Sequence, residues 1–414
     1  MHYFSYKGND LYAEGVSLEE LAREYGTPLY VYSKRTLLRH IRAYKKAFGP
    51  GGIISYALKA NSNGAILRLL AGEGCGADIV SGGELFRALR AGIPASKTVY
   101  AGVGKTAEEI AYALREKILM FNVESGEELE EINRVAGLSG RKAPVALRVN
   151  PDVDPLTHPY ISTGMKKYKF GMPVEEALEF YLRAREMDNI EIIGVHEHIG
   201  SQLTQVSPFK DALKKVLALI GKLRDSGIKL KYLDLGGGLG ISYRRGENPP
   251  EPSALAKSLL PLLKGSGLSV IVEPGRSIIG NAGVLLTRCL YRKKTELKKF
   301  VIVDAGMNDL IRPSLYGSYH EIMPVRKSTF ARAGAKVDIV GPICESGDFL
   351  AQDRRMPGIR PGELLCVLGA GAYGFSMSSN YNSRPHPAEV MVNGREHQLI
   401  RKRGVYRDLI RGEL

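Results

Sequence analysis

The sequence predicts an α/β protein: a (β/α)8 TIM-like barrel joined to a C-terminal all-β domain. Short apolar segments alternate with amphipathic helical segments eight times within about 225 residues, which is typical of a closed parallel barrel. Beyond Pro274 the helical periodicity largely ends, and β-rich segments separated by Gly and Pro take its place. A doubly wound open sheet also fits the alternation and stays open as an alternative to the barrel.

The composition is that of a soluble globular protein. Of 414 residues, 44% are hydrophobic and 25% are charged, and no apolar run approaches the roughly 20 residues of a membrane span. The N-terminus has no apolar signal-peptide core and the four cysteines form no C-x-x-C pair, so we expect a cytoplasmic protein without a metal or a disulfide framework. The net charge is +14, but Lys and Arg are scattered among Asp and Glu, which favours anionic metabolites over nucleic acid as partners.

The predicted elements divide the chain into two domains. Ser17-Leu18-Glu19-Glu20 has the spacing of a capping box and starts a helix that ends near Gly26; a strand at 29–32 and a helix at 36–48 follow. The barrel, assigned to residues 27–277, has its strands at 53–58, 77–80, 98–101, 119–123, 145–149, 192–196, 232–235 and 269–272. The β domain covers residues 278–414, with strands at 284–291, 300–303, 336–340, 364–368 and 389–392, and takes in residues 1–26, whose strand at 11–14 is expected to pair into it.

The first barrel strand ends at Lys59. At the edge of a core, burial disfavours the ammonium form, so the pKa of Lys59 is expected to fall and its amine to become a nucleophile suited to a Schiff base. A lysine whose head reaches solvent is the structural alternative.

Polar side chains also end other strands of the predicted barrel. In this fold the chemistry lies at the C-terminal ends of the strands. The candidates there are Asp78, Arg148 to Asn150, His196 to Gln202, Asp234 to Gly240, and Glu273 to Arg276.

Gly236, Gly237 and Gly238 follow the seventh strand, where barrels of this kind bind phosphate. Amides without side chains can converge on a phosphate group, and Gly275 and Arg276 add donors after the eighth strand. A flexible turn is the alternative.

Glu273 and His198 suit a flat nitrogen heterocycle. A carboxylate keeps a pyridine nitrogen protonated, which makes the ring an electron sink, and an imidazole can stack on it. Glu273 also fits a structural pair with Arg276. His196 and His198 at i, i+2 lie on one side of the strand, so they also fit a metal pair or two hydrogen-bonded core histidines. Together with Lys59 and the glycines, these residues describe a site for pyridoxal 5'-phosphate.

The chain resembles the barrel-type (fold type III) pyridoxal-phosphate decarboxylases over nearly its whole length, and most closely their diaminopimelate branch. The motifs that carry the resemblance are Tyr56 to Asn61, His158 to Gly164, Lys169 to Gly171, His196 to Gln202, Gly236 to Gly238, Glu273 to Arg276, Arg312 to Tyr316, Cys344 to Asp348, Gly371 to Gly374 and Tyr381 to Pro385.

The resemblance implies decarboxylation of meso-2,6-diaminopimelate to L-lysine, the last step of lysine biosynthesis. It implies that Lys59 forms the Schiff base, that His198 stacks on the ring, that Glu273 pairs with its nitrogen and that Asp78 supports the site. The residues implied at or near the phosphate are Ser201, Gly236, Gly237, Gly238, Gly275, Arg276 and Tyr373. Those implied to bind substrate are Arg276, Arg312, Tyr316, Glu345 and Tyr373. Cys344 is the implied proton donor, and Cys344 and Glu345 are implied to act across a homodimer.

Three other functions are weighed against this one. A decarboxylase of lysine, ornithine or a carboxylated polyamine needs no arginine such as Arg312 for a distal carboxylate. An alanine racemase is expected to carry arginine in place of Glu273. A non-catalytic cofactor carrier is expected to lack the second domain, and a degenerate decarboxylase to lack Lys59 or Cys344. For Cys344, a small buried hydrophobe is the structural alternative.

Overall fold

Eight parallel strands close into a barrel in the computed structural model, which describes residues 2–154 and 169–414. Neighbours along the chain pair in order, and β8 pairs with β9 to close the ring, which excludes the open sheet. The barrel strands are β5 (Ile53–Ala57), β6 (Gly76–Ile79), β7 (Thr98–Tyr100), β8 (Met120–Val123), β9 (Ala143–Asn150), β11 (Ile190–Glu197), β12 (Tyr232–Asp234) and β13 (Ser269–Val272). A two-residue strand, β10 (Met172–Pro173), pairs with the end of β9.

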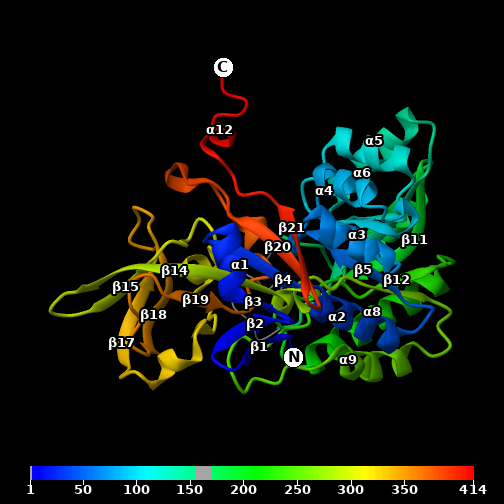
Figure 1. The fold of residues 1–414 in the computed structure, drawn as a ribbon. Helices are drawn as coiled ribbons and strands as arrows, with labels where there is room; N and C mark the ends of the chain where they lie inside the picture. The colour runs from blue at the N-terminus through cyan, green and yellow to red at the C-terminus, as the bar shows by residue number, and fades with distance from the viewer. Residues whose placement is uncertain (1, 155–168) are drawn as a thin grey trace. The chain divides into compact units, whose positions relative to one another are not determined.

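Amphipathic helices follow the strands and lie around the barrel (Figure 1). Helices that follow a barrel strand are α3 (Gly64–Gly72), α4 (Gly82–Arg90), α5 (Ala107–Glu116), α6 (Gly126–Leu138), α7 (Ala177–Arg185), α8 (Ser207–Asp225) and α9 (Pro252–Leu259), whereas α2 (Lys34–Phe48) precedes β5. Helix α6 illustrates the pattern, since it buries Leu129, Ile132, Val135 and Ala136 at helical spacing. Each strand therefore ends beside the turn that leads into a helix, and this turn positions the candidate site residues.

The chain divides into two units. Unit 2, the barrel unit, comprises residues 41–241 and 248–275. Unit 1 comprises residues 1–40, 242–247 and 276–414. The segment 242–247 lies within the barrel sequence but belongs to unit 1, so one loop of the barrel sequence contributes side chains to the other unit.

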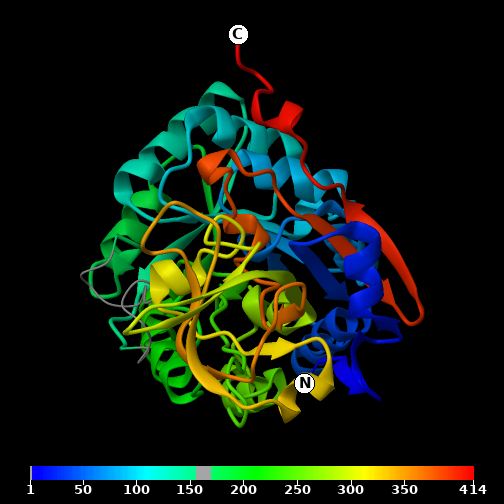
Figure 2. The same cartoon turned by 60° about the vertical axis from the view of Figure 1, so that its left-hand side comes forward.

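Unit 1 is built on a nine-stranded mixed sheet, part of which faces the viewer in Figure 2. Its strands are β4 (Leu29–Ser33), β14 (Gly283–Lys294), β15 (Lys299–Val303), β16 (Ile322–Pro324), β17 (Ala335–Val340), β18 (Phe349–Met356), β19 (Leu364–Val367), β20 (Ala388–Asn393) and β21 (Glu396–Arg401). The long strand β14 pairs with β4, β15 and β19 and so holds the sheet together. Unit 1 also contains the short helices α1 (Leu18–Tyr25), α10 (Arg276–Ile279), α11 (Arg312–Tyr316) and α12 (Tyr406–Leu409).

Strand β4 corrects the prediction that residues from 27 onward belong to the barrel. It pairs with β14 and β20 in the sheet of unit 1. The apolar run Leu29–Ser33 predicts a buried strand correctly, but all five of its residues are buried, and this local pattern does not distinguish a barrel from a mixed sheet.

The N-terminal strand lies in unit 1 as predicted, but it pairs in a small sheet of its own. Strand β2 (Asp10–Ala13) joins β1 (Phe4–Lys7) and β3 (Val16–Ser17). Leu11 and Ala13 share a core with Val284 and Val390 of the larger sheet. Helix α1 (Leu18–Tyr25) follows at the predicted place; however, the Ser17 side chain makes no capping hydrogen bond, so the predicted capping box does not form.

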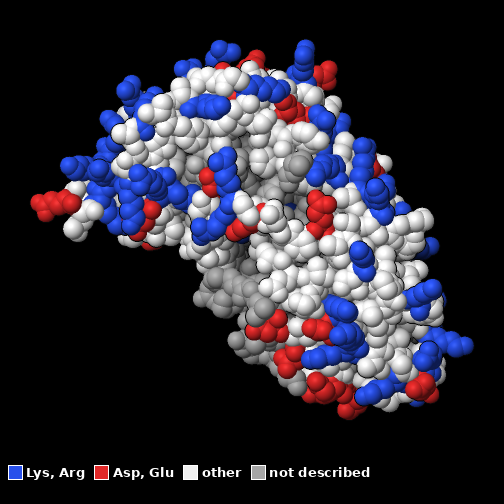
Figure 3. All heavy atoms as spheres, turned by 90° about the horizontal axis from the view of Figure 1, so that it is seen from below, with Lys and Arg blue, Asp and Glu red and all other residues white. Residues whose placement is uncertain are grey.

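Basic and acidic side chains are interspersed on the face shown in Figure 3, as their mixture along the sequence predicts. None of the helices in the described ranges combines the length and the apolarity that a membrane crossing requires.

Candidate active site

Lys59 follows β5 in a short 3-10 turn, where its amine meets a buried carboxyl group. Its Nζ atom lies 2.6 Å from Asp78 Oδ2, which comes from the neighbouring strand β6. The Lys59 side chain is about one-third exposed, whereas Asp78 is fully buried. Burial and the nearby Glu273 raise the pKa of Asp78 to about 7, while Lys59 opposes this shift. The amine is thus fixed in place by one buried partner and still reachable by a ligand.

Glu273, directly after β13, is held in a buried polar network. Asn122 donates from Nδ2 to Glu273 Oε1 at 3.2 Å and to Asp234 Oδ2 at 3.1 Å. His196 Nε2 lies 3.6 Å from Glu273 Oε2. Burial and Glu273 raise the pKa of Asp234 well above its usual range; burial also raises the pKa of Glu273, but His196 and Lys59 lower it below its usual value. Asp234 therefore keeps its proton and Glu273 is ionised.

His198 is fixed by the glycine segment that follows β12. Its Nδ1 accepts a hydrogen bond from the Gly237 amide at 3.1 Å, so in the neutral ring the hydrogen sits on Nε2. Burial, with Arg148 and Lys59, lowers the pKa of His198 well below its usual value. The imidazole is therefore neutral and held in one orientation.

The three glycines are required by close packing. A Cβ atom would lie 2.5 Å from Glu197 O at Gly236, 2.2 Å from Glu273 O at Gly237 and 2.3 Å from Gly200 O at Gly238. The Gly236 amide donates to Asp234 Oδ1 at 3.0 Å and the Gly237 amide to His198. Two of the three amides expected at a phosphate are thus engaged within the protein, and a phosphate role for this segment stays a prediction.

Gly275 brings the end of β13 against the lysine segment. A Cβ at Gly275 would lie 3.1 Å from the Cβ atoms of both Ala57 and Ala60, which flank the turn that carries Lys59. The close approach explains a glycine between Glu273 and Arg276.

The interpretation of His196 and His198 as a metal pair is not supported. In the described part of the chain, the one group with metal-ligating geometry is His196, Asp234 and Glu273, and it does not include His198.

On unit 1, two buried arginines lie close together. Arg276, in α10, donates from Nη1 to Tyr243 Oη at 2.7 Å. The Arg312 guanidinium, at the start of α11, lies 4.7 Å from the centroid of the same Tyr243 ring. Arg276 also lies 4.9 Å from the ring centroid of Tyr373, whose φ is 56°. Two cations with aromatic walls form a receptor suited to a carboxylate.

Cys344 and Glu345 lie in the exposed loop between β17 and β18. The Cys344 amide donates to Asn382 Oδ1 at 2.7 Å, and Asp348 Oδ2 accepts from the Ile343 amide at 2.7 Å. Cys344 is the exposed cysteine, whereas Cys75, Cys289 and Cys366 are buried. The structural alternative of a buried Cys344 is therefore wrong, and its thiol is accessible to a ligand or to another subunit.

The sequence-predicted site residues fall into two groups. Unit 2 holds Lys59, Asp78, His198, Ser201, Gly236, Gly237, Gly238, Glu273 and Gly275, and unit 1 holds Arg276, Arg312, Tyr316, Cys344, Glu345 and Tyr373. The motif His158 to Gly164 lies outside the described residues. Sequence reasoning gave no role to Asn122, Tyr243, His320 or Asn382; a polar Asn122 inside an otherwise apolar strand was a usable signal.

A pyridine cofactor fits the unit 2 group. Asp78 Oδ1 and both ring nitrogens of His196 are buried without a hydrogen-bond partner among the described residues. An ionised Glu273, a neutral His198 and a reachable Lys59 amine are the groups that a pyridinium ring with an aldehyde requires.

Comparison with known proteins agrees with this site. Residues 34–280 match the family described as "Pyridoxal-dependent decarboxylase, pyridoxal binding domain". The chain is 54% identical to diaminopimelate decarboxylase of Aquifex aeolicus, covering 98% of this chain and 96% of the relative, and 52% identical to that of Pseudomonas aeruginosa, covering 100% and 99%.

The chain belongs to the diaminopimelate decarboxylase family. Diaminopimelate decarboxylase from Helicobacter pylori, solved in complex with L-lysine, superposes with a TM-score of 0.91 at 45% identity over 95% of this chain and 98% of that one. The structure of that enzyme from M. jannaschii superposes with a TM-score of 0.93 at 41% identity over 100% and 98%. As a family member, the chain is a pyridoxal-phosphate-dependent decarboxylase, and the barrel and β domain predicted for it are confirmed.

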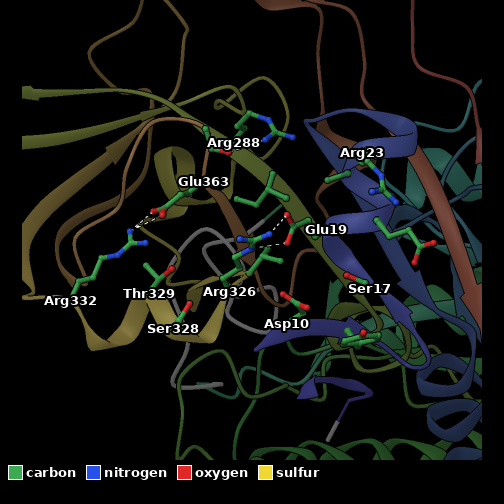
Figure 4. A pocket seen from close by; sticks show the side chains of 16 residues that line it. Asp10, Ser17, Glu19, Arg23, Arg288, Arg326, Ser328, Thr329, Arg332 and Glu363 are labelled. Carbon is green, nitrogen blue, oxygen red and sulfur yellow. Dashed lines mark hydrogen bonds and ion pairs between the residues drawn. The ribbon is translucent and has the colours of Figure 1, made fainter. Parts of the chain in front are cut away.

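A hollow of about 1010 Å³ on unit 1 is a separate feature (Figure 4). Two ion pairs lie in its lining: Arg326 with Glu19 at 2.7 Å, and Arg332 with Glu363 at 2.6 Å. The lining carries four acidic and four basic side chains, so its formal charges balance.

Proposed function

We propose that this chain decarboxylates meso-2,6-diaminopimelate to L-lysine and carbon dioxide, the last step of lysine biosynthesis. The observation that carries the proposal is the half-identical, full-length match to diaminopimelate decarboxylases. Lys59 beside Asp78, the buried Glu273 and the two arginines around Tyr243 support it. The substrate has two amino-acid ends, so one must be held while the other reacts.

In this mechanism most of the residues that would hold the cofactor belong to unit 2. Lys59 would bind it covalently, His198 would lie against its ring, and the ionised Glu273 would accept a hydrogen bond from the protonated pyridine nitrogen, with Asp78 holding the Lys59 amine. Pyridoxal phosphate, when bound, withdraws the electrons of the breaking carbon–carboxylate bond. Ser201, the Gly236–Gly238 segment, Gly275, Arg276 and Tyr373 are assigned to its phosphate side.

The residues of unit 1 hold the unreactive end of the substrate. Arg276, Arg312, Tyr316 and Tyr373 bind its carboxylate, and Glu345 binds its ammonium group. Cys344 donates the thiol proton to the carbon that has lost carbon dioxide. We further propose that the protein works in the cytoplasm as a homodimer, with Cys344 and Glu345 completing the site of the other subunit; the exposure of that loop supports this.

The test is to incubate the protein and pyridoxal phosphate with meso-diaminopimelate, and separately with ornithine and with lysine. Carbon dioxide and lysine from diaminopimelate alone are expected. Release of carbon dioxide from ornithine or lysine would overturn the roles of Arg312 and Glu345 but keep the chemistry. Mixing two inactive variants, Lys59→Ala and Cys344→Ala, tests the shared site, because hybrid dimers would regain one intact site.

A further inference from the structure

One nitrogen atom of Arg312 has no hydrogen-bond partner among the described residues. Its Nη2 donates to Ser318 Oγ at 3.2 Å and its Nη1 faces His320 Nε2 at 3.0 Å. Its Nε is buried and, within the described residues, has no hydrogen-bond partner. An unpaired buried donor on a cation costs free energy, so this position calls for an acceptor.

His320 is fixed as a neutral acceptor for Arg312. Its Nδ1 lies 2.8 Å from the Leu368 carbonyl oxygen, which can only accept, so Nδ1 carries the hydrogen. A guanidinium can only donate, so Nε2 must present its lone pair to Arg312. Burial and Arg312 lower the pKa of His320 to about 3, which keeps this state across the physiological range.

Tyr243 links the two arginines. Its hydroxyl accepts from Arg276 and its ring lies against Arg312. Burial raises the pKa of Tyr243, but Arg276 and Arg312 lower it below its usual value. A polarised phenol between two guanidinium groups offsets their mutual repulsion, which otherwise would push them apart.

The neighbouring residues fix Tyr243 and His320 against each other. Their rings meet edge to face at 5.2 Å. Their neighbours in the sequence are also in contact: the guanidinium of Arg244 lies 3.9 Å from the ring centroid of Tyr319. Arg354 lies at the same distance from that ring and donates to the His320 carbonyl oxygen at 2.9 Å. Segment 242–247 is thereby attached to unit 1.

We propose that Tyr243 and His320 are positioning residues that orient Arg276 and Arg312, with Arg312 Nε free, as one receptor for the unreactive carboxylate, and so set the preference for a substrate that carries it. This inference rests on the proposed function. Neither residue donates to or accepts from the reacting carbon, and each acts through an arginine.

The experiment compares two ligands that differ by this carboxylate. Dissociation constants of L-lysine and of 1,5-diaminopentane are measured by calorimetry on the cofactor-loaded protein, beside kcat and KM for meso-diaminopimelate. Tyr243→Phe keeps the ring and removes the acceptor; His320→Leu removes both ring hydrogen bonds, and His320→Gln keeps one donor and one acceptor. Tyr25→Phe, which removes a hydroxyl bond to His397 elsewhere in unit 1, is the matched control.

The expected result is that Tyr243→Phe and His320→Leu lose about tenfold of the preference for L-lysine, as one misplaced charge-assisted hydrogen bond predicts, with diaminopentane binding unchanged. KM for diaminopimelate rises accordingly, while kcat changes less. His320→Gln restores much of the preference, and Tyr25→Phe keeps all of it.

Two outcomes would overturn the inference: equal weakening of both ligands, which indicates a merely structural role, or an unchanged preference in both variants. If the unaltered protein neither prefers L-lysine nor turns over diaminopimelate, the proposed function itself fails.

Discussion

The Oδ2 atom of Asp78 lies 2.6 Å from the Nζ atom of Lys59, and of the two side chains it is the carboxyl that is fully buried. The strand pair β5–β6 fixes this distance, because Ala57 and Asp78 are in register. Lys59 therefore lies at the end of the barrel strand β5, and its side chain is oriented by Asp78 on the neighbouring strand β6.

Replacing Lys59 with Ala should abolish decarboxylation and the covalent retention of pyridoxal phosphate, because it removes the amine that pairs with Asp78. Activity is measured as carbon dioxide release, and retention as visible absorption after desalting. Lys214→Ala, at an exposed pair with Asp211, is the control. Near-normal turnover in Lys59→Ala would show that Lys59 is not the residue that binds the cofactor.

Gly237→Ala should disrupt the site, because its Cβ would lie 2.2 Å from the Glu273 carbonyl oxygen. We expect cofactor affinity to fall by at least about tenfold and the unfolding temperature to drop. The clash is with a backbone atom, so it can be relieved only by moving the main chain, which costs free energy. Gly221→Ala in α8, where a Cβ meets nothing within 4 Å, is the matched control and should be neutral or stabilising. Equal behaviour of the two variants would contradict the packing argument.

Glu197 should make the protein less stable as the pH rises. Its side chain is buried, its Oε2 has no partner among the described residues, and burial raises its pKa to about 8. In the unfolded chain the pKa of Glu197 is near 4.5, so the folded protein binds this proton more tightly. The free energy of unfolding is therefore highest below pH 4.5 and falls as the pH rises from there towards 8.

In denaturant titrations between pH 5 and 9, the free energy of unfolding of Glu197→Gln should therefore rise relative to that of the wild type. The difference should reach up to a few kcal/mol, at about 1.4 kcal/mol per unit of pKa shift. Glu191→Gln, on the same strand but exposed, should show no such trend. A constant difference between Glu197→Gln and wild type across this range would refute the prediction.

Asn382→Ala should loosen the loop that carries Cys344, because Asn382 Oδ1 accepts from the Cys344 amide and Asn382 sits at φ 53°. We expect kcat to fall by roughly tenfold and the alkylation rate of Cys344 to change, as one lost hydrogen bond predicts. Asn382→Asp keeps the acceptor and should retain most of the activity; Asn380→Ala is the neighbouring control. An unaltered alkylation rate in Asn382→Ala would show that this bond does not position the thiol.

Local sequence patterns predicted the barrel well, because each of its strands is a short apolar run bounded by turn residues. They failed where partners are distant: the run at Leu29–Ser33 falls within the range 27–277 predicted for the barrel domain, but it pairs with β14 and β20. Tyr243 and His320 were missed for the same reason: they come from separate parts of the chain, and their contacts with Arg276 and Arg312 are not visible in the local sequence.

Residue types at the strand ends were enough to predict candidate site residues, but not the hydrogen bonds that hold them. Lys59, Glu273 and the glycines are predicted as site residues from their places at strand ends. That the amides of Gly236 and Gly237 serve Asp234 and His198 could not be predicted, because it depends on the φ of 62° at Gly236 and on close approaches from β11.

The pairing of β4 with β20 has a consequence for synthesis. Tyr32, on β4, donates to Glu389, on β20, across 357 residues of sequence. A ribosome releases the barrel segment long before β20, so unit 2 can fold while β4 still lacks a neighbour on one edge. Nascent or C-terminally truncated chains that stop before Ala388 would expose that apolar edge to aggregation, which makes the last strands a checkpoint for complete translation.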